Sequence, residues 1–465
     1  MRNEMVNYKH KLFKTKSEID YSFNVEDIIK EHFKNSTVNN VTTNIEAGHT
    51  YLGQMIAHDI VPSTTLHLNR KNINQTLNLD SIYGDKNNQA CFDKNGKFIL
   101  GYALSPLGNK IFGKDLLRGT DSKAMIPDAR NDENIIISQL HLFWQKFHNS
   151  IFDELKLKFD LENYFECTKF ILTKLFHDIV LFDYMKKLIH PSIYSLYAGG
   201  YSFFYKNNVS FSKVPLEFSH AVFRFGHSMV RESYNLNNDK NVEINDVLGN
   251  RNLILKTESI IDWGFFFSDY RIIDSHFSMP QSMQKKTDSV PVVQSAMKID
   301  TKIIPGMTKV PFICGKPDDI KNINLKAGNI MKLNFGQEIK VILEKNPIFN
   351  YYFLKNPFYN SQLNKIPLWL YILKEAELET LKGLGLIGSI IVSEVLTNSI
   401  YSTVFNHKAT KYQEELKCIT SSIKKNQKIL EQNNAPTYRY TFLNSEFLRK
   451  PLSMGYCTNY INRKR

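Results

Sequence analysis

The segment YLGQMIAHDI, residues 51–60, brings an imidazole, an amide and a carboxylate close together. On a helix, Gln54 and His58 are i and i+4 and share one face, whereas Asp59 points about 100° away. That face offers groups that can move a proton or order a water molecule. The residues alone leave two other interpretations open: a core histidine that is hydrogen-bonded within the protein, and a His–Asp metal site of a phosphohydrolase, for which His49 is the nearby candidate.

A second imidazole lies in LEFSHAVFRFGHSMV, residues 216–230, which is almost wholly apolar. On a helix, Arg224 and His227 would lie on one face, three residues apart. A buried cation and a buried imidazole need partners, because unpaired burial is costly. His227 is therefore either a satisfied core histidine or a neutral metal ligand, and Gly226 beside it would let a large flat group approach the helix.

A third motif opens the segment PDARNDENIIISQLHLFWQKFHNSIFDEL. Pro127 and Asp128 are signals for the start of a helix, and Arg130 and Glu133 would be i and i+3 on it. Such a pair is most often a surface ion pair of little energetic value. The long apolar continuation predicts a buried helix, which favours a pocket-facing Arg130.

Oxygen-bearing side chains alternate in the loop that leads into LNLDSIYGD, at Asn74, Thr76, Asn78 and Asp80. An extended loop would turn all four toward one side. A hard cation such as Ca²⁺ takes about six to eight oxygen ligands, so the pattern suits calcium. An ordinary Asx-rich turn explains it equally well.

The elements that must position these residues are predicted to be mainly α-helical, with few and short alternating β-type runs. Pro, Gly, Asn and Asp interrupt the apolar runs between about 60 and 127 and between 232 and 324, which predicts long structured loops that wall a pocket or carry ligands. Residues 1–40 are polar and predict an N-terminal arm, and no linker divides residues 41–465, which are expected to form one catalytic domain. Helical periodicity is strong in segments 49–59, 133–158, 162–187, 216–231, 366–377, 386–405 and 409–432.

The composition of the 465 residues, 42% hydrophobic and 23% charged, is that of a globular chain with a sizeable core. The net charge of +13 comes from dispersed lysines and arginines, so no nucleic-acid partner is predicted. Five isolated cysteines without metal-ligand spacing indicate free thiols in a reducing compartment. The N-terminus has no apolar signal region and the longest apolar stretch, LGLIGSIIVSEVL, is short, which predicts a soluble cytoplasmic protein without a transmembrane segment.

Taken together and in this order, the motifs resemble the bacterial branch of the animal-type haem peroxidase superfamily, which includes the cyclooxygenases. They match a distal GQxxxHD, a calcium loop ending in DSxYG, a DxRxxE helix and a proximal RxGH, while PLWLYILKEAELETLKGLGLIGSIIVSEVL looks like C-terminal helices of that branch. The resemblance runs from about Ala47 to Phe405. It implies a large single-domain helical haem peroxidase fold, haem b as cofactor, and hydrogen peroxide and a small halide or phenol-like donor as substrates.

The resemblance also implies roles for single residues. His58 would be the distal histidine that takes a proton from peroxide and returns it to the leaving oxygen. Arg130 would stabilise the developing charge, and Gln54 would order water near the iron. His227 would be the proximal iron ligand, and Arg224 would reach a haem propionate.

Further implied roles concern the ion, the proximal ligand and the attachment of the haem. The amide of Asn329 is expected to accept the N–H of the proximal imidazole. Glu133, three residues after the arginine, could form one ester bond to the haem. Asp59 would complete a calcium site with Asn74, Thr76, Asn78 and Asp80.

Departures from the family pattern limit these expectations. Ala57 replaces the carboxylate that forms a second ester in many relatives, Asn134 excludes a methionine sulfonium link, and Asn78 lowers the ligand charge for calcium. Cyclooxygenases and fatty-acid dioxygenases place a radical-forming tyrosine three residues before the proximal histidine, where this chain has Arg224. Peroxidase activity is therefore favoured over oxygenase activity. A haem-binding protein without turnover would be expected to lack His58 or Arg130, and both are present.

Overall fold

The computed structural model describes residues 11–13, 21–33, 43–61, 76–84, 91–204, 214–249, 252–268, 292–310, 318–360, 365–379, 383–406, 453–454 and 457. Contacts within the chain divide it into two compact units, each built from three segments. Unit 1 consists of Met1–Thr76, Met185–Glu232 and Ser295–Ser402. Unit 2 consists of Leu77–Tyr184, Ser233–Gln294 and Thr403–Arg465. Both units are mainly helical, as the sequence predicts.

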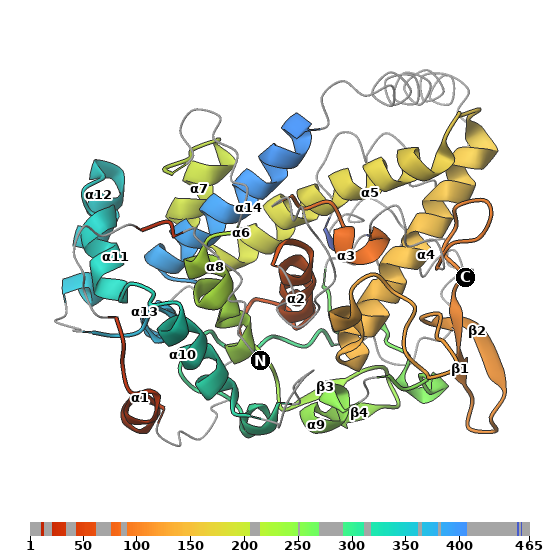
Figure 1. Cartoon of the computed structure of the whole chain (residues 1–465), viewed down its shortest axis with the longest axis horizontal. Helices are drawn as coiled ribbons and strands as arrows, with labels where there is room; N and C mark the ends of the chain where they lie inside the picture. Colours follow the sequence, from red (N-terminus) through yellow and green to blue (C-terminus); the bar gives the residue numbers. More distant parts are fainter. Residues whose placement is uncertain are drawn as a thin grey trace, which may run out of the picture. The chain divides into compact units, whose positions relative to one another are not determined.

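Unit 1 contains helices only among its described elements (Figure 1). Residues near the N-terminus pack on its later helices, because α1 contacts α10 and the Phe33 ring stacks on Trp369 of α13. The elements are α1 (Val25–His32), α2 (Gly48–Ile60), α6 (Met185–Leu188), α7 (Pro191–Ala198), α8 (Leu216–His220), the 3₁₀-helix η4 (Val222–Ser228), the 3₁₀-helix η8 (Pro305–Lys309), α10 (Ile320–Ile330), α11 (Gly336–Leu343), α12 (Pro347–Lys355), the 3₁₀-helix η9 (Pro357–Asn360), α13 (Leu368–Leu378) and most of α14 (Leu386–Asn406).

Unit 2 combines two long helices, α4 and α5, which lie side by side (Figure 1), with two antiparallel hairpins. Tyr102 lies opposite Phe112 in the first hairpin, and Tyr234 lies opposite Val242 in the second. The elements are α3 (Asp80–Tyr83), β1 (Gly101–Leu104), β2 (Lys110–Asp115), the 3₁₀-helix η2 (Ala129–Asp132), α4 (Ile135–Lys158), α5 (Tyr164–Ile179), the π-helical turn η3 (Val180–Tyr184), β3 (Ser233–Asn235), β4 (Asn241–Glu243), α9 (Ile244–Leu248), and the 3₁₀-helices η5 (Thr257–Ser259) and η6 (Trp263–Phe265).

Helix α4 illustrates why the long apolar segments fold as predicted. Its start is capped by Asn134, whose Oδ1 accepts a hydrogen bond of 2.8 Å from the backbone N–H of Ile137. Apolar side chains then follow on every face, including Trp144 and Phe147, which are both fully buried. A helix that is apolar all round is stable only when protein surrounds it, so α4 forms the core of unit 2.

Several elements differ from the sequence prediction. The predicted arm contains α1, whose first N–H groups are capped by Asn24. The single helix predicted over 216–231 is broken at Ala221, where φ is −140° and ψ is −73°, and the helix predicted over 162–187 is interrupted by the π-helical turn. The helix predicted over 409–432 lies outside the described residues. None of the described helices has both the length and the apolar character needed to cross a membrane.

Candidate functional site

The predicted Arg224 and His227 pair lies on η4, which follows α8 directly after the break at Ala221. In a 3₁₀-helix the side chains at i and i+3 are eclipsed, so the guanidinium and the imidazole project from one edge. Both residues keep partial exposure, whereas Phe225 is buried. Apart from its chain neighbours and the backbone of η4, no atom of the described residues lies within 4 Å of the position that a Cβ on Gly226 would take. This edge of η4 is therefore open, as the prediction for Gly226 requires.

The amide that contacts the imidazole of His227 is Asn324. Its Nδ2 lies 2.9 Å from His227 Nδ1, and the residue is completely buried on α10, which packs against α8. Asn329, the amide expected from the sequence, instead donates to the backbone carbonyl of Phe23 at 2.9 Å. The expected partner is thus corrected, because five residues along a helix correspond to a rotation of about 140° and place Asn329 on another face of α10.

Arg224 is held by two acceptors on the same side of unit 1. Its Nε donates to the carbonyl of Ser219 at 3.1 Å, and its Nη1 donates to Oδ1 of Asn324 at 3.2 Å. Among the described residues no carboxylate forms an ion pair with it. Burial lowers the pKa of Arg224 to about 10, and burial together with the Arg224 charge lowers the pKa of His227 to about 3. At neutral pH the site therefore combines a guanidinium cation with a neutral imidazole.

His58 and Gln54 lie on α2, as the periodicity predicts, and α2 packs against η4 within unit 1. The helix is buried on nearly all sides, and within it only Gln54 and Ala57 keep intermediate exposure. His58 follows Gln54 by one turn and borders this less covered strip, whereas Asp59 is buried elsewhere on the helix. The structure therefore places the amide of Gln54 on the less covered strip of α2 and the buried His58 next to that strip.

The alternative of a His–Asp metal site at α2 receives no support. His49 Nδ1 lies 3.1 Å from Oε2 of Glu46, and Lys187 reaches the same carboxylate at 2.8 Å. His49 is thus part of a buried charged cluster at the start of α2. Within the described ranges no three His, Cys, Asp or Glu side chains gather closely enough to hold a metal ion.

Arg130 lies in unit 2, on the short 3₁₀-helix η2 and not on the long helix that was predicted to begin at Pro127. Asp128 caps η2 and pairs with Arg130 through a fork, with Nε 3.0 Å from Oδ1 and Nη2 2.7 Å from Oδ2. Asn134 then adopts an extended backbone and starts α4 as a separate element. Asp128 therefore orients the guanidinium of Arg130, and Glu133 lies at the junction between the two helices.

The turn that carries Arg130 is anchored by a second arginine, which the sequence analysis did not single out. Arg118 donates to both oxygens of Asp132, at 2.7 and 2.9 Å, and its Nε donates to Asp115 at 2.9 Å. The three side chains are 7%, 4% and 1% exposed, respectively. Burial raises the pKa of Asp132, and the charge of Arg118 offsets only part of this effect. The network ties η2 to the end of strand β2.

The predicted calcium loop is described only in part, because Asn74 lies outside the described residues. Thr76 is buried, and Asn78 and Asp80 are partly exposed. Leu79 adopts a left-handed backbone with φ 58° and ψ 33°, so the chain turns there and Asp80 begins α3. The expected extended alternation is therefore wrong at Leu79, and calcium binding stays a prediction.

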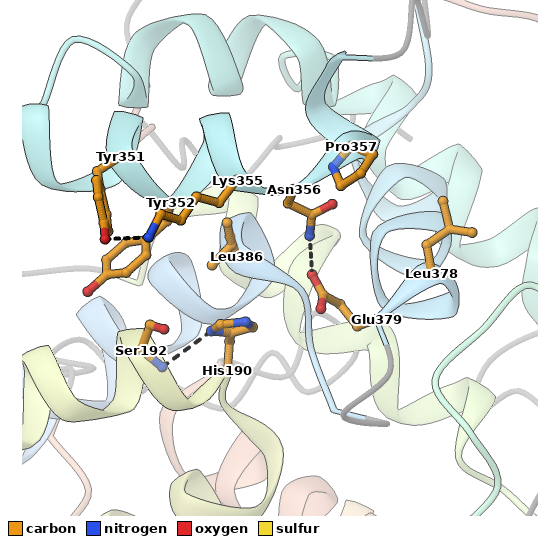
Figure 2. Close-up of a pocket in the computed structure, with 10 residues that line it drawn as sticks. All are labelled: His190, Ser192, Tyr351, Tyr352, Lys355, Asn356, Pro357, Leu378, Glu379 and Leu386. Carbon is orange, nitrogen blue, oxygen red and sulfur yellow. Dashed lines mark hydrogen bonds between the residues drawn. The ribbon is translucent and has the colours of Figure 1, made fainter.

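A separate pocket of about 610 Å³ lies in unit 1 between α7, α12, the C-terminal end of α13 and the N-terminal end of α14 (Figure 2). His190, Lys355 and Glu379 face it, and Glu379 accepts a hydrogen bond of 2.7 Å from Asn356 (Figure 2). None of the described residues predicted for catalysis or haem binding lines this pocket.

Residues 101–301 match the family model for animal haem peroxidases. This part of the chain is similar to an animal haem peroxidase domain. The matched range includes Arg130 and His227, whereas His58 lies before it. No curated protein matches the chain.

Several solved structures share the fold. Peroxidase A from Dictyostelium discoideum is 14% identical, with a TM-score of 0.52, and the alignment covers 81% of this chain and 82% of that one. Fatty acid alpha-dioxygenase from Oryza sativa is 10% identical, with a TM-score of 0.55 and coverages of 81% and 72%. The enzyme of that kind from Arabidopsis thaliana is 12% identical, with a TM-score of 0.52 and coverages of 81% and 68%. At these identities the likeness concerns the fold alone.

Proposed function

We propose that this chain is a haem-dependent peroxidase that reduces hydrogen peroxide with electrons from a small donor, a halide or a phenol. The observation that carries the proposal is the setting of His227, a neutral imidazole bonded to the buried amide of Asn324. Arg224 beside it is a partly buried cation with no carboxylate partner among the described residues. A neutral imidazole beside a cation suits an iron ligand and a propionate contact once the amide presents its oxygen to the ring, and the open edge at Gly226 leaves room for a flat macrocycle.

Haem, when bound, would supply the redox chemistry that cleaves the peroxide O–O bond. His58 would take the proton of the oxygen that binds and return it to the oxygen that leaves, so that water and not hydroxide departs. Gln54, one turn earlier on α2, would hold a water molecule in reach of the imidazole. The role of Arg130 is carried over from the DxRxxE motif: its guanidinium would stabilise negative charge on the leaving oxygen.

Lipid oxygenation is the second candidate, because two of the similar structures are fatty acid dioxygenases. That chemistry would require a tyrosine three residues before the proximal histidine. Arg224 occupies this position and has no oxidisable phenol. Peroxidase activity is accordingly the favoured function, while the bacterial branch, the reducing substrate and a covalent link through Glu133 stay predictions.

The test compares His227→Ala and His58→Ala, with His32→Ala on α1 as a control. We expect the wild type, produced with ample haem, to show a Soret band that shifts on adding peroxide. His227→Ala should lose the haem, and His58→Ala should keep it but react with peroxide about 10² to 10⁴ times more slowly in stopped flow. The control should behave like the wild type.

A colourless wild-type protein would overturn the haem assignment. An unchanged peroxide rate in His58→Ala would remove that residue from the distal role. Oxygen uptake with a fatty acid, in the absence of peroxide-dependent donor oxidation, would favour the dioxygenase.

A further inference from the structure

Asn324 is shared by the two functional side chains of η4. Its Oδ1 lies 3.2 Å from Nη1 of Arg224, and its Nδ2 lies 2.9 Å from Nδ1 of His227. A guanidinium can only donate hydrogen bonds, so the atom of Asn324 that faces Arg224 must be the carbonyl oxygen. The atom that faces His227 is then the NH₂ group, which can only donate.

This orientation determines where the proton of His227 resides. Because Nδ1 accepts a hydrogen bond from Asn324, its lone pair is engaged and the ring proton is on Nε2. A neutral imidazole binds a metal through the nitrogen that carries no proton. As held by Asn324, His227 therefore cannot offer Nε2 to iron. Ligation through Nε2 requires the proton to be on Nδ1 and an acceptor to face it.

The same amide can supply that acceptor if Arg224 releases it. Rotation of the Asn324 carboxamide by half a turn would turn Oδ1 toward Nδ1 of His227. Nδ1 would then take up a proton from water while Nε2 releases its proton to water, so the net charge of the imidazole stays the same. Arg224 opposes this rotation because it holds Oδ1. The guanidinium is a partly buried cation without a carboxylate partner among the described residues, so an incoming carboxylate would compete strongly with a neutral amide for it.

We propose that Arg224 and Asn324 couple carboxylate capture to iron ligation: a haem propionate draws Arg224 away, Asn324 turns, and His227 adopts the tautomer that binds iron. The inference rests on the proposed function. Arg224 and Asn324 are thus positioning residues that act through His227. Their coupling makes His227 a competent ligand for a porphyrin that carries free carboxylates and a poor one for a porphyrin that lacks them.

The test titrates the full haem-free chain with haem b and with haem dimethyl ester, in which both propionates are blocked. Resonance Raman of the ferrous complexes reports the iron–histidine bond. We expect the wild type to bind haem b through His227, and to bind the ester at least about tenfold more weakly and without that bond. In Arg224→Leu no guanidinium holds Oδ1 of Asn324, so both porphyrins should form the iron–histidine bond.

Asn324→Asp is the second variant, because a carboxylate has acceptor oxygens for Arg224 and for the Nδ1–H group at once. It should also ligate the ester through His227. Arg231→Leu is the matched control, since Arg231 donates to the carbonyl of Ser295 at 2.6 Å, and it should keep the wild-type preference. Nitrogen-15 shifts of histidine-labelled haem-free protein, assigned with His227→Gln, should show the proton on Nε2 in the wild type and on Nδ1 in Asn324→Asp.

Equal ligation of both porphyrins by the wild type would overturn the coupling, as would an Arg224→Leu protein that forms the iron–histidine bond with haem b alone. A wild-type protein that binds no haem b would overturn the proposed function itself. The two failures are therefore distinguishable.

Discussion

The buried network around Arg118 makes a quantitative prediction for unit 2. In Arg118→Met the carboxylates of Asp115 and Asp132 lose their shared cation while they stay 1% and 4% exposed. Water cannot replace the lost partner at that exposure. Removal of one member of a buried ion pair costs about 3–5 kcal/mol, and Arg118 serves two carboxylates. Asp115 keeps hydrogen bonds from two backbone N–H groups, so most of the free-energy cost comes from the unpaired carboxylate of Asp132.

The measurement is urea unfolding at pH 7, followed by tryptophan fluorescence in a Trp369→Phe background. Of the three tryptophans, Trp144 and Trp263 then remain, and both belong to unit 2. Lys97→Met is the control, because Lys97 forms an ion pair of 2.7 Å with Asp153 whose two side chains are 30% and 58% exposed. Loss of such a surface pair should cost less than about 1 kcal/mol.

The pH dependence of the Arg118→Met defect supplies a second check. Burial already raises the pKa of Asp132, and without Arg118 this pKa should rise further. A carboxyl whose folded-state pKa is raised stabilises the fold below its unfolded pKa, and this contribution is lost as pH rises through the folded pKa. The defect should therefore be largest near pH 7 and shrink toward pH 5. A cost no larger than that of Lys97→Met, or a defect that does not change with pH, would refute the reasoning.

Three further predictions concern other sites. After treatment of the haem protein with peroxide, acid–acetone should leave part of the haem attached, and Glu133→Gln should release all of it in intact mass analysis; complete extraction from the wild type would exclude the ester. Metal analysis should find calcium, and a chelator should change the haem spectrum in the wild type but not in Asp59→Ala; absence of calcium would contradict the prediction. Burial raises the pKa of Glu375 from 4.5 to about 7, so its stabilising contribution is present below pH 4.5 and lost as pH rises to 7. Glu375→Gln should therefore flatten the fall in Tm over this range, and an unchanged slope would reject that role.

The sequence by itself determined the features that depend on neighbouring residues. The period of the apolar residues predicted α2, α4, α13 and α14, because a helix that must bury one or more faces repeats its apolar positions every three to four residues. The i and i+4 relation of Gln54 and His58 followed from helix geometry and holds in the structure. Arg224 and His227 share one edge because three residues separate them in either kind of helix.

Only the tertiary structure decided which distant groups meet. Asn324 contacts His227 across 97 positions of the chain, and this contact depends on which face of α10 packs toward η4. Asn329 is as polar and lies on the same helix, so residue type could not distinguish the two amides. Arg118 and Asp132 meet for a similar reason, at the junction of a strand end and a 3₁₀-helix.

The breaks in the regular backbone at Leu79 and Ala221 could not be predicted from the sequence either. Leu79 is buried with a positive φ, which few leucines adopt, and Ala221 interrupts an otherwise apolar helical segment. Local propensity favours neither geometry. The period of the apolar residues therefore could not predict either break.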